Sequence, residues 1–326
     1  MNLFLRSSFT IAFVFITSFG FAQNQISLDL NHTFNEEALV YGQTYTDAFG
    51  RTVEFSRVRY YLSSLEIVHD GGQLTVLEDL YVLVHANITN YDLGSYNIET
   101  VEKLRFDVGV DYDANHANSS SFLPTHPLGP QAPLMDWGWP AGYFFFDVNG
   151  ATDTNENGTP NSNFEFRGFG DELLTSVELN YNSSASSGQI NLSTQVCLDR
   201  WVGTLDLDQV GINHGSNNFH SAYMENTTAN SVFVTGVAAS VSSLEIPSYI
   251  YVDYSMAYAP VLNYQLPENQ SYSIYVYDLS GRLMFEDNNL DHQGNYFILK
   301  ELNSGTYIAK FVGKNHSQSK RFVVSR

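Results

Sequence analysis

Cysteine is almost absent from this chain of 326 residues, since Cys197 is the only one. A single cysteine cannot form an internal disulfide, so the core and the hydrogen bonds must hold the fold. Basic residues are also scarce, with 15 Lys and Arg against 35 Asp and Glu and a net charge of −20. Phosphate binding depends on clustered cations, so this balance argues against nucleic acid as a partner. The acidity instead favours solubility and the attraction of cations.

The chain also lacks a hydrophobic run of the roughly 20 residues that a transmembrane helix needs. Residues 1–22 carry one basic residue, Arg6, then a short apolar core and a small-residue end at Ala22. This pattern is typical of a cleaved secretory signal peptide. We therefore predict a protein that passes through the periplasm and ends up secreted or at the cell surface, with no transmembrane segment. An exported chain without disulfides is typical of the bacterial envelope.

Helical periodicity is scarce, and alternation of apolar and polar residues is common. Residues 26–34 alternate in this way and place His32 on the apolar side, where a buried imidazole needs a carbonyl, a carboxylate or a metal ion as partner. Turn signals separate many further candidate strands, over residues 52–55, 57–68, 80–84, 104–111, 143–148, 163–166, 175–181 and 188–198. The pattern predicts an all-β fold, an antiparallel β-sandwich body with one short helix.

The one clear helical segment covers residues 216–228, with Ser216 as a candidate cap. His220 and Met224 are four residues apart, so a helix would bring an imidazole and a thioether to one face. A helix that packs its Met and aromatic residues on a sheet explains the same spacing equally well.

The stretch from His126 to Tyr143 gathers a histidine, Met135, Trp137 and Trp139. If residues 135–139 are extended, the methionine and both tryptophans point the same way. They could then line a pocket with the imidazole. The alternative is ordinary core packing, because no pair of donors here has a spacing diagnostic of a metal site.

The polar loop after residue 152 places Asp153, Asn155 and Asn157 at positions 1, 3 and 5 of a calcium-loop pattern. Position 12, which needs a bidentate Glu, is Phe164. A hydrated turn is therefore the favoured interpretation, with weak calcium binding as the alternative.

Beyond residue 243 the chain changes character and becomes richer in basic residues, with short strands of its own. We predict three parts: a signal peptide over 1–22, a β-domain over 23–243 and a small all-β domain over 244–326. The last part contains Tyr-Asp-Leu-Ser-Gly-Arg at 277–282, Leu-Asn-Ser-Gly-Thr-Tyr at 302–307 and a basic terminal strand. In these motifs it resembles the C-terminal sorting domain of the Bacteroidetes type IX secretion system, which implies that machinery as a partner.

The body resembles the MbnP family of copper-binding proteins, which includes the CorA type. The matching motifs are Leu-Asn-His-Thr-Phe at 30–34, Val-Arg-Tyr-Tyr-Leu-Ser-Ser-Leu at 58–65, His-Pro-Leu at 126–128 and Met-Asp-Trp-Gly-Trp at 135–139. The resemblance implies copper as the bound metal, held by histidines and a tryptophan oxidised to kynurenine. It also implies a diheme peroxidase of the MauG/MbnH kind as the enzyme that oxidises the tryptophan.

On this resemblance the predicted copper donors are His32, His126, Met135, Trp137, Trp139, His220 and Met224. Trp137 or Trp139, rather than Trp201, is the predicted site of oxidation. Where relatives carry a histidine after Phe-Glu-Phe, this chain has Arg167, so one ligand or neighbouring group is expected to be missing. His69, His85 and His214 have no companion donor in the sequence.

Three classes of function compete. We predict an extracellular copper carrier or scavenger with no turnover of its own. An enzyme such as a copper oxidase or a hydrolase is the second class, but the chain has no Gly-x-Ser-x-Gly elbow and no His-Glu-x-x-His motif. The third class is a structural or ligand-binding β-protein of the cell surface that binds no metal.

Overall fold

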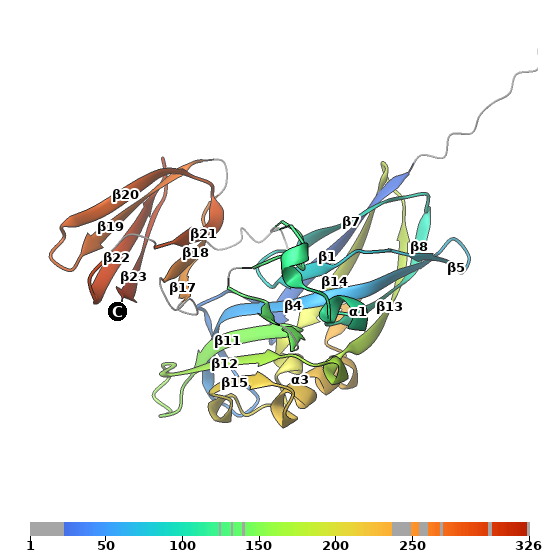
Figure 1. Ribbon diagram of the computed structural model, residues 1–326, viewed down its shortest axis with the longest axis horizontal. Coiled ribbons are helices and arrows are strands. Elements are labelled where there is room, and N and C mark those ends of the chain that lie inside the picture. Colours follow the sequence, from blue (N-terminus) through green and yellow to red (C-terminus); the bar gives the residue numbers. More distant parts are fainter. Residues whose placement is uncertain are drawn as a thin grey trace, which may run out of the picture.

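The computed structural model describes residues 23–123, 125–131, 133–138, 141–236, 249–253, 260–267, 270–298 and 302–324. The predicted signal peptide and Trp139 lie outside these ranges. Within them the chain is mostly β-structure, as predicted, and forms two large sheets, one short hairpin and two small sheets near the C-terminus (Figure 1).

The larger sheet has nine strands and is organised around β4 (Thr52–His69), which has partners on both sides along its length. The sequence predicted two strands here, over 52–55 and 57–68, but one long strand spans both. Its partners and their neighbours are β3 (Thr44–Thr46), β5 (Gln73–Val76), β6 (Val82–His85), β8 (Thr100–Val108), β11 (Phe146–Thr152), β12 (Ser162–Gly168), β13 (Thr175–Ser184) and β15 (Ile212–Gly215).

The second sheet has five strands: β1 (Asn24–Phe34), β2 (Glu37–Ala38), β7 (Asn90–Tyr96), β14 (Gln189–Cys197) and β16 (Phe233–Thr235). Most pairs in the two sheets are antiparallel, but β1 runs parallel to β14 and β12 runs parallel to β15. These parallel pairs join segments far apart in the chain, which local alternation cannot reveal.

Helices are few, as predicted: α1 (Tyr112–Asn115), α2 (Leu198–Trp201) and α3 (Asn218–Ala229), with 3-10 turns η1 (Ser119–Ser121), η2 (Asp171–Leu173) and η3 (Leu207–Gln209). The predicted helix over 216–228 is confirmed as α3. Its cap is Asn217 and not Ser216, because the Asn217 side chain accepts a hydrogen bond from the Phe219 amide at 3.0 Å. None of the helices among the described residues is long and apolar enough to cross a membrane.

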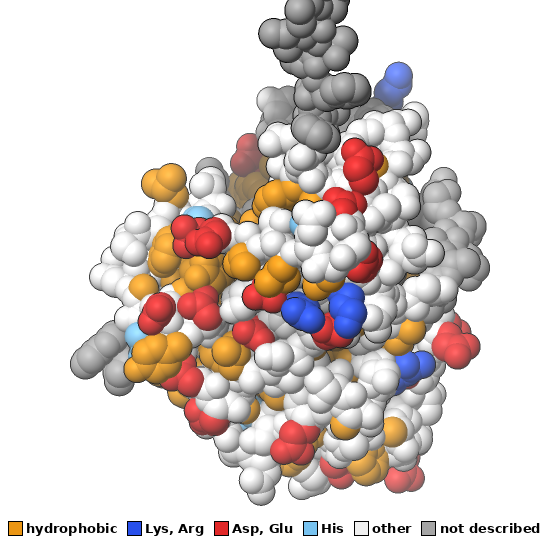
Figure 2. Space-filling view, turned by 90° about the vertical axis from the view of Figure 1, so that its right-hand side faces the viewer, with side chains coloured by type: hydrophobic (Ala, Val, Ile, Leu, Met, Phe, Trp, Pro, Cys, Tyr) orange, Lys and Arg blue, Asp and Glu red, His pale blue; other side chains and the backbone are white. Residues whose placement is uncertain are grey.

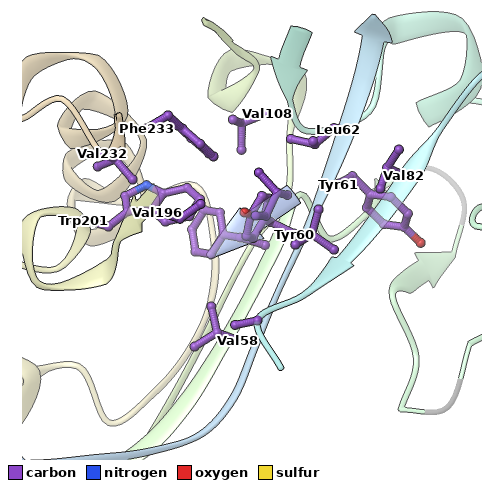
Figure 3. Packing of buried hydrophobic residues seen from close by; sticks show 14 of the residues in the cluster. Val58, Tyr60, Tyr61, Leu62, Val82, Val108, Val196, Trp201, Val232 and Phe233 are labelled. Carbon is purple, nitrogen blue, oxygen red and sulfur yellow. The ribbon is translucent and has the colours of Figure 1, made fainter. Parts of the chain in front are cut away.

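The main core lies between the two sheets. Alternation along β4 sends Val58 and Tyr60 to the inner face of the nine-stranded sheet, where Tyr60 meets Trp201 and Phe233 (Figure 3). Arg59 and Tyr61 point to the opposite face, here called the outer face.

The outer face is covered by the described residues between 111 and 145, here called the covering segment, which includes the hairpin of β9 (Asp136–Gly138) and β10 (Gly142–Tyr143). Two side chains from β4 tie it down: Arg59 Nη1 donates to the Pro133 carbonyl at 3.0 Å, and the Tyr61 hydroxyl donates to the Pro127 carbonyl at 2.9 Å.

The C-terminal part has two antiparallel sheets and a hydrophobic cluster that shares no residue with the main core. Its strands are β17 (Tyr249–Asp253), β18 (Val261–Gln265), β19 (Tyr272–Asp278), β20 (Leu283–Leu290), β21 (Gln293–Phe297), β22 (Gly305–Val312) and β23 (Ser317–Val324). In Figure 1 these strands form the orange and red unit.

Candidate metal centre

A row of polar side chains crosses the outer face of the nine-stranded sheet. Register partners in adjacent strands carry their side chains on the same face. The register pairs His85 of β6 with Arg59 of β4, Arg59 with Asp147 of β11, Asp147 with Arg167 of β12, and Arg167 with His214 of β15. This polar row therefore has a histidine at each end and a charged centre.

The centre of the polar row is a buried cluster of charges. Asp147 is fully buried and accepts hydrogen bonds from Arg57 Nε at 2.7 Å, Arg59 Nη2 at 2.5 Å and Arg167 Nε at 3.0 Å. Burial alone would raise the pKa of the Asp147 carboxyl group, but the three guanidinium groups hold that pKa well below its usual range. The cluster ties together β4, β11 and β12, the three strands that lie between the two that carry the terminal histidines.

At one end of the polar row, His214 lies beside Trp137 of the covering segment. The two rings meet edge to face with centroids 5.3 Å apart, and Trp137 also stacks on Phe169 at 6.0 Å. Nε2 of His214 is 2.8 Å from a carboxylate oxygen of Glu165. Because a carboxylate accepts hydrogen bonds, Nε2 carries the proton in the neutral ring, which leaves a lone pair on Nδ1. Trp137 is 53% exposed, so this corner is open to solvent.

Arg167 stands where the resemblance led us to expect a histidine, and its register partner is His214. The imidazole that is missing at position 167 is therefore found one strand away, at His214 in β15. The Arg167 guanidinium packs over the Phe144 ring at 5.3 Å, and its Nη2 is buried without a hydrogen-bond partner among the described residues. No sequence pattern pointed to His214, because Glu165 and His214 are 49 residues apart and meet only through the β12/β15 pairing.

At the other end, His126 of the covering segment stacks on Phe122, with centroids 4.7 Å apart. Its Nδ1 accepts a hydrogen bond from the Leu128 amide at 3.1 Å. In the neutral ring the proton then sits on Nε2, so in this conformation neither nitrogen offers a free lone pair to a metal ion. His126 and His85 both line one pocket.

His32 lies on the other side of the sheet from His126. It packs against Tyr60 on the inner face, with Nε2 3.0 Å from the hydroxyl, whereas the covering segment that carries His126 is tied to Tyr61 on the outer face. Burial lowers the pKa of His32 to about 3, and the Leu30 carbonyl opposes this only partly. Its Nδ1 has no hydrogen-bond partner of normal geometry. The structure does not bring His32 and His126 into one site.

His220 and Met224 are both buried on α3. The two ring nitrogens of His220 face the Asn217 side-chain oxygen at 3.0 Å and the Asn213 carbonyl at 3.3 Å. Burial lowers the pKa of this imidazole. These contacts fit the interpretation of α3 as a helix that packs on the sheet.

Met135 and Trp137, which an extended stretch would point the same way, differ in burial. Met135 is 1% exposed and Trp137 is 53% exposed. Gly138 has a φ of +88°, which L side chains rarely adopt, so regular extension does not continue beyond Trp137. Trp201 is fully buried, donates from Nε1 to the Thr227 hydroxyl at 2.9 Å and stacks on Tyr223.

The polar loop between β11 and β12 is built from backbone hydrogen bonds to its own side chains. Asp153 accepts from the amides of Asn155 and Gly158, Asn155 accepts from Asn157, and Asn157 accepts from Thr159. These bonds are those of successive turns, which agrees with the hydrated-turn interpretation. Within the described ranges, no three His, Cys, Asp or Glu side chains are grouped closely enough to hold a metal ion.

Comparison with known families identifies the class of protein. Residues 23–221 match the MbnP family model, and residues 259–325 match the model described as "Secretion system C-terminal sorting domain". The chain therefore belongs to the MbnP family and carries a sorting domain of the type IX secretion system, which makes it a secreted or cell-surface protein.

Among solved structures, the chain is similar to MbnP from Methylosinus trichosporium, at 13% identity and a TM-score of 0.44. The match covers 58% of this chain and 82% of that one. A search of curated proteins found no match.

Proposed function

We propose that this protein binds copper outside the cell as a carrier or scavenger, with no turnover of its own. Two findings support the proposal: the chain belongs to the MbnP family, and its sorting domain directs it to the cell surface or beyond. The observation that carries the proposal is the contact between Trp137, His214 and Glu165 at one end of the polar row.

His214 is the donor around which we propose that copper binds. Its Nε2 proton is engaged by Glu165, so Nδ1 is free to bind a metal ion, and a carboxylate behind a ligating imidazole raises its basicity and fixes its tautomer. Imidazole nitrogen is a good ligand for copper. His214 thus takes the role that Arg167 cannot fill, because a guanidinium has no free lone pair.

Trp137 is the tryptophan that we propose is oxidised to kynurenine. Its exposure, 53%, gives a partner enzyme access to the ring, whereas Trp201 is fully buried between Tyr60 and Tyr223. The oxidation requires oxidising equivalents from outside this chain, and the family resemblance implies a diheme peroxidase as their source. Conversion to kynurenine would open the indole ring and release its C2 carbon as formate, which turns the ring nitrogen into an amine and places a ketone oxygen next to His214.

A copper titration against a chromogenic competitor tests this proposal. We expect His214→Ala to lower the copper affinity about 100-fold, since one imidazole is lost from a site with few donors. His69→Ala is the matched control: both nitrogens of His69 have partners, Asp70 and Thr75, so its loss should leave copper affinity unchanged. His32→Ala should lower the melting temperature without changing the affinity.

Protein purified from its natural host should be compared with protein made without the peroxidase. Peptide mapping should then find kynurenine at Trp137 in the first and not in the second. Equal copper affinity in the wild type and in His214→Ala would show that His214 is not a copper ligand. Absence of copper binding in both preparations would favour a surface β-protein that binds no metal.

A further inference from the structure

A pocket of about 550 Å³ lies along β6, at the end of the polar row that is opposite Trp137. One wall is the chain from Asp79 to His85. The rest is formed by Tyr91 and Asp92 at β7 and by residues of the covering segment, Thr125, His126, Pro127 and Gln131. Neither His214 nor Trp137 lines the pocket, but His126, which the sequence predicted as a copper donor, does.

The β6 strand has a free edge along this pocket. Among the described strands, β6 pairs only with β4. The backbone N–H and C=O of His85 are both bonded to the Tyr91 hydroxyl, at 2.8 and 3.1 Å, so they point away from β4. In an antiparallel pair this orientation repeats every second residue, which means that the N–H and C=O of Leu83 also point away from β4.

The hydrogen bonds of β4 show independently that the backbone groups of Leu83 point away from β4. Tyr61 is the register partner of Leu83, but its N–H donates to the Phe145 carbonyl and its C=O accepts from the Gly109 amide. Both bonds lie on the side of β4 away from β6. Within the described part of the chain, the N–H and C=O of Leu83 have no hydrogen-bond partner.

The free N–H and C=O of Leu83 can bind a ligand that offers one hydrogen-bond acceptor and one donor. Leu83 is 9% exposed, and a backbone group out of contact with water costs free energy unless it is bonded. Leu83 is buried, so the edge is reached only through the pocket, and an unpaired strand edge is the usual template for an added strand. The wall from Tyr81 to His85 is roughly 15 Å long at about 3.3 Å per residue, the length of an extended peptide of four or five residues. Tyr91 already occupies the backbone groups of His85, so pairing with the strand centres on Leu83.

The facing wall is held in place before any ligand arrives. Gln131 Nε2 donates to the carbonyls of His126, Pro127 and Gly129 at 3.1 to 3.2 Å, which clamps the turn. His126 is stacked on Phe122 and lies 6.2 Å from the Tyr81 ring. A rigid groove loses less entropy on binding than a flexible one.

The charges around the groove favour a basic ligand. Asp79 and Asp92 are both exposed lining residues, and no Lys or Arg lines the pocket. The chain as a whole has a net charge of −20, and Figure 2 shows many acidic and few basic side chains on one face. This field attracts cations and repels acidic segments.

We infer that this groove binds an extended peptide segment of a partner protein by strand addition to β6, with the peptide backbone paired to Leu83 and a Lys or Arg side chain set between Asp79 and Asp92. Backbone pairing supplies affinity, and the acidic rim selects a basic sequence. The inference does not depend on copper binding.

The test uses the blocked peptide acetyl-Val-Thr-Lys-Thr-Val-amide as the probe. The peptide should bind the whole protein with a dissociation constant below about 1 mM, measured by calorimetry. Hydrogen exchange should show protection of the Leu83 amide on binding. A peptide with Glu in place of Lys should bind at least about tenfold more weakly, because it meets the acidic rim.

Two variants separate backbone pairing from side-chain packing. Leu83→Pro removes an N–H that the fold does not use, and proline is tolerated at strand edges. Leu83→Ala removes the same side chain but keeps the N–H. We expect the proline variant to bind the peptide about tenfold more weakly than the alanine variant.

A probe methylated on the backbone nitrogens gives a readout that does not depend on the folding of any variant, and it should not bind. Asp79→Asn combined with Asp92→Asn should erase the preference for Lys over Glu, while Glu156→Gln, outside the pocket, should leave it intact. No protection of Leu83 at about 1 mM peptide, or equal binding of the methylated probe, would overturn the inference. His214→Ala should bind the peptide like the wild type, which separates this result from the copper proposal.

Discussion

His32 and His85 are held neutral by their surroundings. Burial is the main cause in both cases and lowers the pKa of each imidazole to about 3, and Arg59 adds to the effect at His85. In the unfolded chain each imidazole has a pKa of about 6.5. The unfolded state therefore binds more protons than the folded state between about pH 6.5 and pH 3.

The stability of the protein should consequently fall as pH decreases from about 6.5, and be fully present above it. Replacing His32 by Gln removes one titrating group while keeping a polar side chain near Tyr60. Between pH 6 and pH 5, we expect the free energy of unfolding of His32→Gln to change with pH less steeply than that of the wild type, by about 1.2 kcal/mol per pH unit. Urea unfolding at several pH values measures this. Equal slopes in both proteins would show that His32 is not buried in the neutral form.

Within the described residues, Asp147 is the only carboxylate that contacts all three guanidinium groups of the buried cluster, those of Arg57, Arg59 and Arg167. Asp147→Asn would remove the carboxylate that pairs with buried Arg59 and leave Arg57 and Arg167 with Glu165 alone, so we expect a loss of about 3 to 5 kcal/mol in the free energy of unfolding. Glu178→Gln is the matched control, because Glu178 pairs with Lys103 and Arg105 at the surface and should cost less than about 1 kcal/mol. Similar losses in both variants would contradict the structural role of Asp147.

At the scale of elements, the covering segment depends on a close approach at Gly142. Its φ is +76°, and a Cβ atom there would lie 2.2 Å from the Asn115 side-chain oxygen. That oxygen accepts a hydrogen bond from the Tyr143 amide at 2.8 Å, which fixes the start of the Tyr143 strand against α1. An added methyl group would break this contact.

Gly142→Ala should therefore destabilise the protein by about 2 to 4 kcal/mol, from backbone strain and the clash together. Gly138→Ala isolates the strain, because Gly138 also has a positive φ but has nothing within 4 Å of the added Cβ. We expect it to cost about 1 kcal/mol. Denaturant unfolding of both variants gives the difference, and equal losses would mean that Asn115 yields without cost.

At the scale of the whole molecule, the body and the C-terminal part have separate hydrophobic cores. The main cluster runs from Ile26 to Phe233 and the second from Ile250 to Val324. Because the proposed copper site lies in the body, a protein of residues 23–243 should fold and bind copper as tightly as one that ends at residue 326. Copper at 100 times its dissociation constant should then stabilise both by about 2.7 kcal/mol. Thermal melting with and without copper checks this, and a shorter protein that folds but loses copper would contradict it.

The sequence by itself determined the broad character of the protein. We could predict export, the all-β class, the sorting domain and the family from the sequence, because they depend on local patterns: alternation, turn residues and short motifs in order. The helix over 216–228 was also predicted from the sequence, with its cap placed one residue too early. The signal peptide and the division of the chain at residue 243 remain predictions.

Only the tertiary structure decided which side chains meet. His214 had no companion in the sequence, yet the parallel pairing of β12 and β15 sets it beside Arg167 and Glu165. His32 and His126 both looked like donors, but adjacent residues of β4 point to opposite faces, and these two histidines lie on different sides. Strand register over long separations depends on how the whole core packs, and no local pattern encodes that.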